Sequence, residues 1–142
     1  MRNIRCPGGY SMNKKIVVVD DDPKVILVVE KALIQLDFEV FSTGDGNKAL
    51  ELVKKNKPAV LVSDILIPGI DGAALCGLVK NDPEFANTKV ILITGVYKDP
   101  SFRAELDSSA DDFLEKPIDI ERLVGIVTNQ VVDYDLAQTR KK

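Results

Sequence analysis

The feature that most constrains the fold is a repeated alternation of short apolar runs with longer amphipathic segments, which begins at Lys15. The short runs are rich in β-branched residues, as is typical of parallel strands that are buried on both faces. They are predicted as strands over residues 15–20, 38–43, 59–63, 89–94 and 112–115. This alternation predicts an α/β fold, in which a doubly wound five-stranded parallel sheet lies between two layers of helices.

The segments between the strands show the spacing of helices that bury one face. Helices are predicted over residues 23–36, 45–55, 73–81 and 100–108, and from residue 119 to at least residue 132. Asp22 is a natural N-cap for the first helix, and Pro23 suits its first position. The inward face of this helix is predicted to carry Val25, Val28, Val29, Ala32, Leu33 and Leu36.

A length of 142 residues fits one domain with a core of its own. We predict a disordered extension over residues 1–13, one folded domain over residues 14–133 and a C-terminal tail over residues 134–142, with no second domain after it. The net charge of −3 argues against a dedicated nucleic-acid binder, which would show a basic patch, so no direct nucleic-acid contact is expected. No apolar run approaches the roughly 20 residues that span a bilayer, and we expect a cytoplasmic protein without membrane contact.

The chain contains no histidine and only two cysteines. It therefore has no Ser-His or Cys-His nucleophile pair, no zinc-histidine site and no histidine that could accept a phosphoryl group. Cys76 lies in an apolar helical pattern and is expected to be a small core residue.

Polar side chains gather where the predicted strands end. Ligands of open parallel sheets bind at the carboxyl ends of the strands. The residues at these ends are Asp20, Asp21 and Asp22 where the first strand ends, Asp64 where the third ends, Thr94 where the fourth ends and Lys116 after the fifth.

Carboxylates gathered at one sheet edge need a compensating charge. Two unit charges about 4 Å apart repel by roughly 4 kcal/mol at an effective dielectric of 20. Oxygen-only ligands suit a hard cation, Mg²⁺ above all, so Asp20, Asp21 and Asp64 are candidate metal ligands, whereas Asp22 caps a helix. A solvated acidic loop is the alternative for the three aspartates alone. The fourth carboxylate and Lys116 at neighbouring strand ends favour the metal site.

Carboxylates, Mg²⁺ and a lysine together form a phosphoryl-transfer arrangement. An aspartate can itself act as the nucleophile and form an aspartyl phosphate. The metal and the lysine ammonium would then stabilise the charge on the transferring oxygens.

Four motifs, taken in their order and spacing, resemble those of a known family. They are IVVVDDDP, VSDILIPGIDG, VILITG and DDFLEKP. From Lys14 to Val132 the chain resembles a response regulator receiver domain, the phosphoacceptor module of two-component signalling, and looks like a single-domain chemotaxis regulator. The resemblance implies a flavodoxin-like sheet of strand order 2-1-3-4-5.

The resemblance also implies roles for the acidic residues. Asp64 matches the phosphorylated aspartate and also contacts the metal. Asp21 matches the direct metal ligand, and Asp20 matches the acidic partner that holds metal-bound water. The backbone carbonyl of Leu66 matches the third protein ligand to Mg²⁺.

Three further positions match the residues that bind and sense the phosphoryl group. Lys116 resembles the phosphoryl-binding lysine, and Thr94 resembles the switch hydroxyl. Phe113 occupies the aromatic switch position. The peptide bond between Lys116 and Pro117 is implied to be cis.

The implied function is to take a phosphoryl group from a histidine kinase or a histidine phosphotransfer protein onto Asp64. The face built by helix 4, strand 5 and helix 5 would then change for a downstream target protein. The implied oligomeric state is a monomer or a phosphorylation-dependent homodimer. Apart from its own phosphorylation and slow dephosphorylation, the chain is not expected to be an enzyme.

Two alternatives stay open from the residues. The chain could be a phosphorelay shuttle that passes the phosphoryl group on to a histidine phosphotransfer protein. It could also be a phosphohydrolase of the haloacid dehalogenase type, because Asp20 and Asp22 have the Asp-x-Asp spacing of that class. Lys24 then stands where a small residue is expected, which disfavours this alternative.

The sequence departs from the family pattern at several positions. Leu66 and Val96 lie two residues after Asp64 and Thr94 and cannot orient an attacking water, so slow self-dephosphorylation is expected. Ser109 stands where glycine is usual.

Leu27 and Ile34 form an outward stripe that is either two ordinary exposed side chains or a docking surface for a kinase helix.

Overall fold

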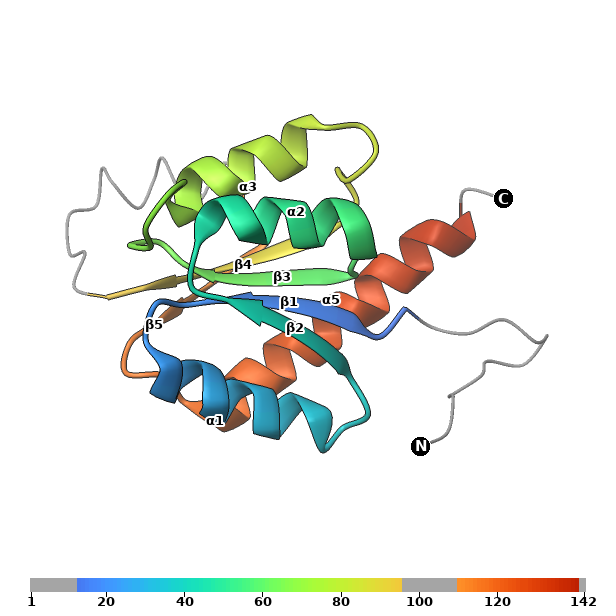
Figure 1. The fold of residues 1–142 in the computed structure, drawn as a ribbon. Coiled ribbons are helices and arrows are strands. Elements are labelled where there is room, and N and C mark those ends of the chain that lie inside the picture. Colours follow the sequence, from blue (N-terminus) through green and yellow to red (C-terminus); the bar gives the residue numbers. More distant parts are fainter. Residues whose placement is uncertain (1–12, 96–109, 141–142) are drawn as a thin grey trace.

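The computed structural model describes residues 13–95 and 110–140. In these residues five strands form one parallel sheet with the order β2-β1-β3-β4-β5, as predicted (Figure 1). The strands are β1 (Lys15–Val19), β2 (Glu39–Thr43), β3 (Val60–Asp64), β4 (Lys89–Thr94) and β5 (Asp112–Glu115).

Helices cover both faces of the sheet (Figure 1). The helices α1 (Pro23–Ile34) and α5 (Ile120–Arg140) pack on one face, and α2 (Gly46–Asn56) and α3 (Gly72–Asn81) pack on the other. The helix predicted over residues 100–108 lies outside the described residues, as do Val96 and Ser109. None of the described helices combines the length and the hydropathy needed to cross a bilayer.

The core consists of two apolar layers, because successive strand residues point to opposite faces of the sheet. Ile16 and Val18 of β1 face the layer formed with α1 and α5. Val17 and Val19 face the layer formed with α2 and α3, where Cys76 is fully buried as predicted. Two covered faces explain why the strands are continuous apolar runs.

Helix α1 begins as predicted but buries a narrower face. The side chain of Asp22 accepts a hydrogen bond from the Lys24 N–H at 2.9 Å, which caps the helix start. The prediction was wrong for Val28 and Leu36, which are 50% and 44% exposed. Val28 lies at the edge of the apolar stripe, beside a groove. Leu36 lies after the last helical residue, Ile34, so helical spacing no longer sets its direction.

Helix α5 is longer than the sequence pattern indicates. It runs to Arg140 and so continues through residues 134–140, which were predicted to form a tail. Leu123, Val127 and Val131 form its buried line. Tyr134 packs against the same cluster and extends the contact beyond the predicted end.

Candidate functional site

The carboxyl edge of the sheet brings three aspartates together. Asp64 is the last residue of β3. Asp20 directly follows β1, the strand that is hydrogen-bonded to β3. One carboxylate oxygen from each of Asp20, Asp21 and Asp64 lies within 4.8 Å of the others. Asp20 and Asp64 are 1% and 5% exposed, whereas Asp21 is open to solvent. The sequence prediction that these carboxylates meet is therefore confirmed.

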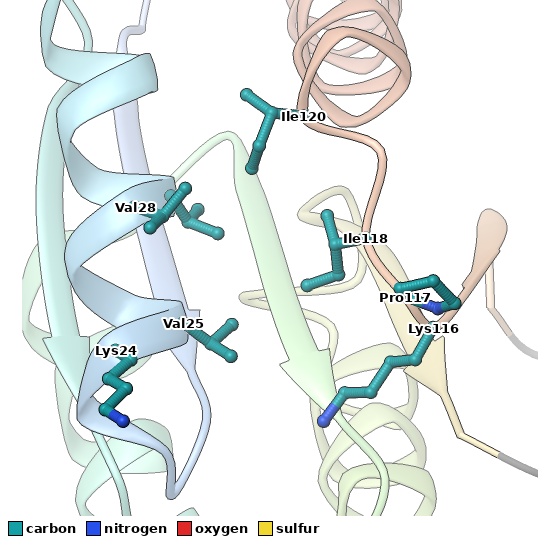
Figure 2. Close-up of a pocket in the computed structure, with 8 residues that line it drawn as sticks. Lys24, Val25, Val28, Lys116, Pro117, Ile118 and Ile120 are labelled. Atoms are coloured by element: carbon teal, nitrogen blue, oxygen red, sulfur yellow. The ribbon is translucent and has the colours of Figure 1, made fainter.

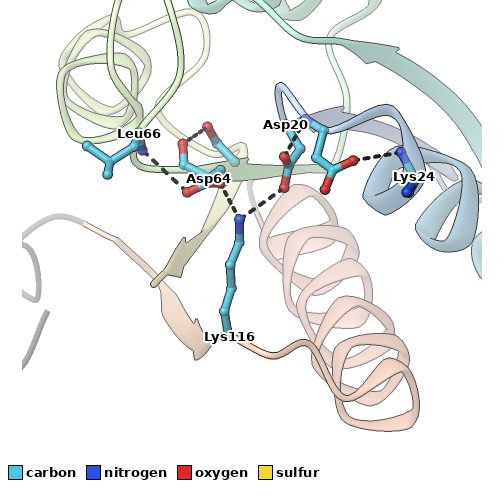
Figure 3. Close-up of polar contacts among 7 residues, drawn as sticks. Asp20, Lys24, Asp64, Leu66 and Lys116 are labelled. Atoms are coloured by element: carbon cyan, nitrogen blue, oxygen red, sulfur yellow. Dashed lines mark hydrogen bonds and ion pairs between the residues drawn. The ribbon is translucent and has the colours of Figure 1, made fainter. Parts of the chain in front are cut away.

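Lys116 reaches the same cluster from the end of β5 (Figure 3). Its Nζ lies 2.6 Å from Asp64 Oδ2 and 3.6 Å from Asp20 Oδ2. The Lys116 N–H donates to the Thr94 carbonyl oxygen at 2.8 Å, which ties the lysine backbone to β4. The Lys116–Pro117 peptide bond is cis, as the resemblance implies.

Asp20 carries a buried charge that the protein only partly compensates. Its Oδ1 accepts a hydrogen bond from the Asp22 N–H at 2.9 Å, but its buried Oδ2 has no hydrogen-bond partner in the part of the chain that the structure describes. Burial raises the pKa of Asp20, and the charges of Asp64 and Asp21 add to this effect against the opposing influence of the Asp22 N–H and Lys116. An oxygen-only cluster fits a divalent cation such as Mg²⁺ when one of its buried carboxylate oxygens has only a 3.6 Å ion pair with Lys116 to compensate it.

Lys116 keeps its proton in this setting. Burial alone would lower the pKa of its ammonium group, but the hydrogen bond to Asp64 and the charges of Asp64 and Asp20 outweigh burial and raise it. A fixed ammonium group therefore stands beside Asp64, where it can stabilise negative oxygens.

Thr94 and Phe113, the two predicted switch residues, lie on neighbouring strands. Thr94 ends β4 and is 1% exposed, and its buried Oγ1 has no hydrogen-bond partner among the described residues. Phe113 lies in β5, half-buried against the layer of α2 and α3. The register pairs Phe113 with Leu92, two residues before Thr94.

Leu66 lies just beyond the strand that carries Asp64. Its side chain is 64% exposed, and its N–H donates to Asp64 Oδ1 at 3.3 Å (Figure 3). Ser63 points elsewhere, because its Oγ donates to the Asp64 carbonyl oxygen at 2.8 Å within the buried strand. Ser63 thus has a structural role beside the cluster.

Sequence reasoning missed a groove beside this cluster, between α1 and the segment that joins β5 to α5 (Figure 2). Its volume is about 330 Å³, and its walls are mainly apolar. The sequence carries no signal for it, because Val28 fits the helical spacing of the core face and only the structure shows that it is exposed. The lining residues are Lys24, Val25, Val28, Val29, Lys116, Pro117, Ile118 and Ile120.

Known proteins resemble this chain in sequence and in fold. The family model of the response regulator receiver domain matches residues 16–128. Response regulator PleD of Caulobacter vibrioides is 35% identical over 108 residues, which cover 76% of this chain and 24% of PleD. The DNA-binding dual master transcriptional regulator RpaA of Synechocystis is 29% identical over 113 residues, which cover 80% of this chain and 47% of RpaA. The chain thus spans about a quarter to a half of these two relatives.

The solved structures agree with the family model. The receiver domain of the Francisella response regulator 1452 matches with a TM-score of 0.77 at 28% identity, over 85% of this chain and 98% of that domain. The family model alone covers most of the 142 residues. The chain therefore belongs to the response regulator receiver domains, the phosphoacceptor modules of two-component signalling.

Proposed function

We propose that Asp64 takes a phosphoryl group from a phosphohistidine of a partner kinase or phosphotransfer protein. The observation that carries this proposal is the meeting of Asp64 with Lys116, at 2.6 Å, inside a cluster of carboxylates. A carboxylate oxygen of Asp64 would attack the phosphorus of a phosphohistidine whose other ring nitrogen is protonated. The electron pair of the breaking N–P bond returns to the histidine nitrogen, which leaves a neutral imidazole on the partner and an aspartyl phosphate on Asp64.

The other residues of the site orient and stabilise the transferring group. Lys116 holds its ammonium group where the phosphoryl oxygens would lie. Asp20, Asp21, Asp64 and the Leu66 carbonyl would hold Mg²⁺, which supplies further positive charge to the phosphoryl oxygens when bound. The burial of Asp64 limits the access of water to the reacting carboxylate.

The signal would leave the site through Thr94 and Phe113. We propose that the Thr94 hydroxyl, which has no hydrogen-bond partner among the described residues, donates a hydrogen bond to the phosphoryl group. Phe113 would then pack more deeply beside it. The phosphoryl group would stabilise one of two arrangements of the face that includes β5 and α5, as a population shift. A target protein in the cytoplasm would bind this face. The chain would be a monomer or a phosphorylation-dependent homodimer.

Transfer from a labelled kinase tests this function. A histidine kinase labelled on its phosphohistidine should pass the label to the wild-type chain in the presence of Mg²⁺ and not to Asp64→Asn. A chase with an unlabelled histidine phosphotransfer protein then separates the two proposed outputs. Label that stays on the chain supports the switch, whereas label that moves on supports the relay. Kinase that keeps its label with every receiver concentration tested would contradict phosphotransfer from that partner.

The groove beside the cluster predicts where the phosphohistidine helix docks. Its apolar wall and its closeness to Lys116 suit a helix that brings a histidine to Asp64. We expect Val28→Gln to slow transfer from the kinase about tenfold, which corresponds to the loss of one central apolar interface contact worth about 1.4 kcal/mol. Phosphorylation by acetyl phosphate should stay at the wild-type rate.

Leu27→Gln is the matched control, because Leu27 is 52% exposed on the same helix but does not line the groove. If Val28→Gln and Leu27→Gln slowed transfer from the kinase equally, the outward stripe of Leu27 and Ile34 would be favoured as the docking surface. If neither variant slowed transfer, α1 would not be the docking surface.

The lifetime of the aspartyl phosphate is expected to be long because Leu66, which is 64% exposed beside Asp64, cannot orient water. Leu66→Asn should raise the rate of dephosphorylation about tenfold by offering an amide to the attacking water. The decay of the phosphorylated mass after removal of the phosphodonor measures this rate. Leu66→Ala controls for the loss of the large side chain, and equal decay in Leu66→Asn and wild type would refute the explanation.

A further inference from the structure

The start of α2 contacts the loop between β3 and α3 (residues 65–71) backbone to backbone. The Gly46 N–H donates to the Pro68 carbonyl oxygen at 3.0 Å. A Cβ at Gly46 would lie 1.8 Å from the Ile70 carbonyl oxygen and 2.8 Å from its carbon. Because side-chain carbons do not approach backbone atoms so closely, any residue other than glycine would push the loop and the helix apart.

The same loop is held at its other end beside Asp64. The Gly72 N–H donates to the Ile65 carbonyl oxygen at 2.8 Å, and a Cβ at Gly72 would lie 2.3 Å from the Asp64 carbonyl oxygen. Ile65 and Ile67, which belong to the loop, are buried in the core. Because both ends of the loop are fixed, a displacement of Ile70 must be accommodated within the segment that carries Leu66.

A second set of contacts ties α2 to this loop. The Asp45 side chain caps α2 by accepting hydrogen bonds from the N–H groups of Asn47 and Lys48, at 2.7 and 3.1 Å. Gly69, which has a φ of 80°, packs so closely that a Cβ there would lie 2.7 Å from Asn47 Nδ2 and 3.1 Å from Asp45 Oδ1. The capped first turn of α2 therefore forms one wall against which the loop rests.

We propose that Gly46 is a positioning residue for the metal site, because it lets α2 hold the loop that presents the Leu66 carbonyl beside Asp64. The inference rests on the proposed function, in which that carbonyl and the carboxylates bind Mg²⁺. Mg²⁺ demands near-ideal octahedral geometry, whereas Ca²⁺ accepts flexible geometry. A displaced loop therefore lowers the affinity for Mg²⁺ more than the affinity for Ca²⁺.

Calorimetric titration of each metal into wild type, Gly46→Ala and Gly77→Ala tests this role. Gly77 is the matched control, since it lies in α3 and a Cβ there meets nothing within 4 Å. In Gly46→Ala we expect the Kd for Mg²⁺ to rise about 10- to 100-fold, as for other residues that orient metal ligands. The Kd for Ca²⁺ should change less than about threefold, because Ca²⁺ tolerates altered geometry. Gly77→Ala should bind both metals as wild type does.

A second variant covers the case in which Gly46→Ala does not fold. Asp45→Ala removes the cap of α2 without adding an atom against the loop, and it should shift the two affinities in the same unequal way by a smaller factor. If the affinities for Mg²⁺ and Ca²⁺ fell by the same factor, the role of Gly46 would be merely structural and the inference would be overturned. Wild-type affinities for both metals in both variants would also overturn it. A wild-type chain that binds neither metal would instead overturn the proposed metal site itself.

Discussion

Lys116→Met is expected to slow phosphorylation of Asp64 by acetyl phosphate about 100- to 1,000-fold, the usual cost of removing one group that stabilises transition-state charge. The Lys116 Nζ lies 2.6 Å from Asp64 Oδ2, so its ammonium group is the nearest fixed positive charge to the reacting carboxylate among the described residues. Methionine keeps the apolar stem and removes only the charge. A time course of intact mass at saturating Mg²⁺ measures the rate.

The affinity for Mg²⁺ separates this effect from damage to the metal site. Without the ammonium group, which also lies 3.6 Å from Asp20 Oδ2, the carboxylate cluster is more negative and should bind Mg²⁺ at least as tightly. Lys116→Arg keeps the charge in a larger group and should lose less activity than Lys116→Met. A Lys116→Met chain phosphorylated at the wild-type rate would show that the lysine has no part in phosphoryl transfer.

Asp20→Asn is expected to stabilise the metal-free protein while it weakens Mg²⁺ binding. Asp20 is 1% exposed, its Oδ2 has no hydrogen-bond partner among residues 13–95 and 110–140, and Asp64 and Asp21 lie close by. Removing a charge so placed relieves repulsion and should raise the free energy of unfolding by about 1–3 kcal/mol. Urea denaturation in the presence of a chelator measures the difference.

The pH dependence follows from the raised pKa of Asp20. Burial, with the nearby aspartates, raises this pKa above its ordinary value of 3.8, so the folded state binds the proton more tightly than the unfolded state. The stability of the metal-free wild type should therefore fall relative to Asp20→Asn as the pH rises from below 3.8 through the raised pKa. Below pH 3.8 the free energies of unfolding of the two proteins should differ little.

Asp22→Asn is the matched control for this prediction. Asp22 is exposed and caps α1, and asparagine caps helices about as well as aspartate. Its free energy of unfolding without metal should stay close to that of the wild type. If Asp20→Asn proved less stable than the wild type without metal, the carboxylate of Asp20 would be favourable where it lies, and burial would not dominate its energetics.

The strands and the site were predictable because their causes are local in sequence. The boundaries of β4 and β5 agree with prediction, since polar residues flank each apolar run. In a parallel sheet the residues after each strand meet at one edge, so Asp20, Asp64 and Lys116 could be placed together without coordinates.

The remaining features depend on tertiary contacts that no local pattern encodes. Val28 fits the helical period, yet it faces a groove because the segment after β5 leaves that edge of α1 open. The end of α5 carries charged residues that resemble a solvated tail, although Tyr134 still packs against the core. Gly46 resembles an ordinary residue at a helix start, and only the structure shows the loop pressed against it.

The central claim is that Asp64 accepts a phosphoryl group at a metal-dependent site. The most direct test is the intact mass of the protein after incubation with Mg²⁺ and acetyl phosphate, beside an Asp64→Ala control and a sample with chelator. We predict one phosphoryl adduct in the wild type with Mg²⁺ and none in either control. A folded, Mg²⁺-binding wild type that gains no adduct from acetyl phosphate or from a labelled kinase, or an adduct that persists in Asp64→Ala, would contradict the claim.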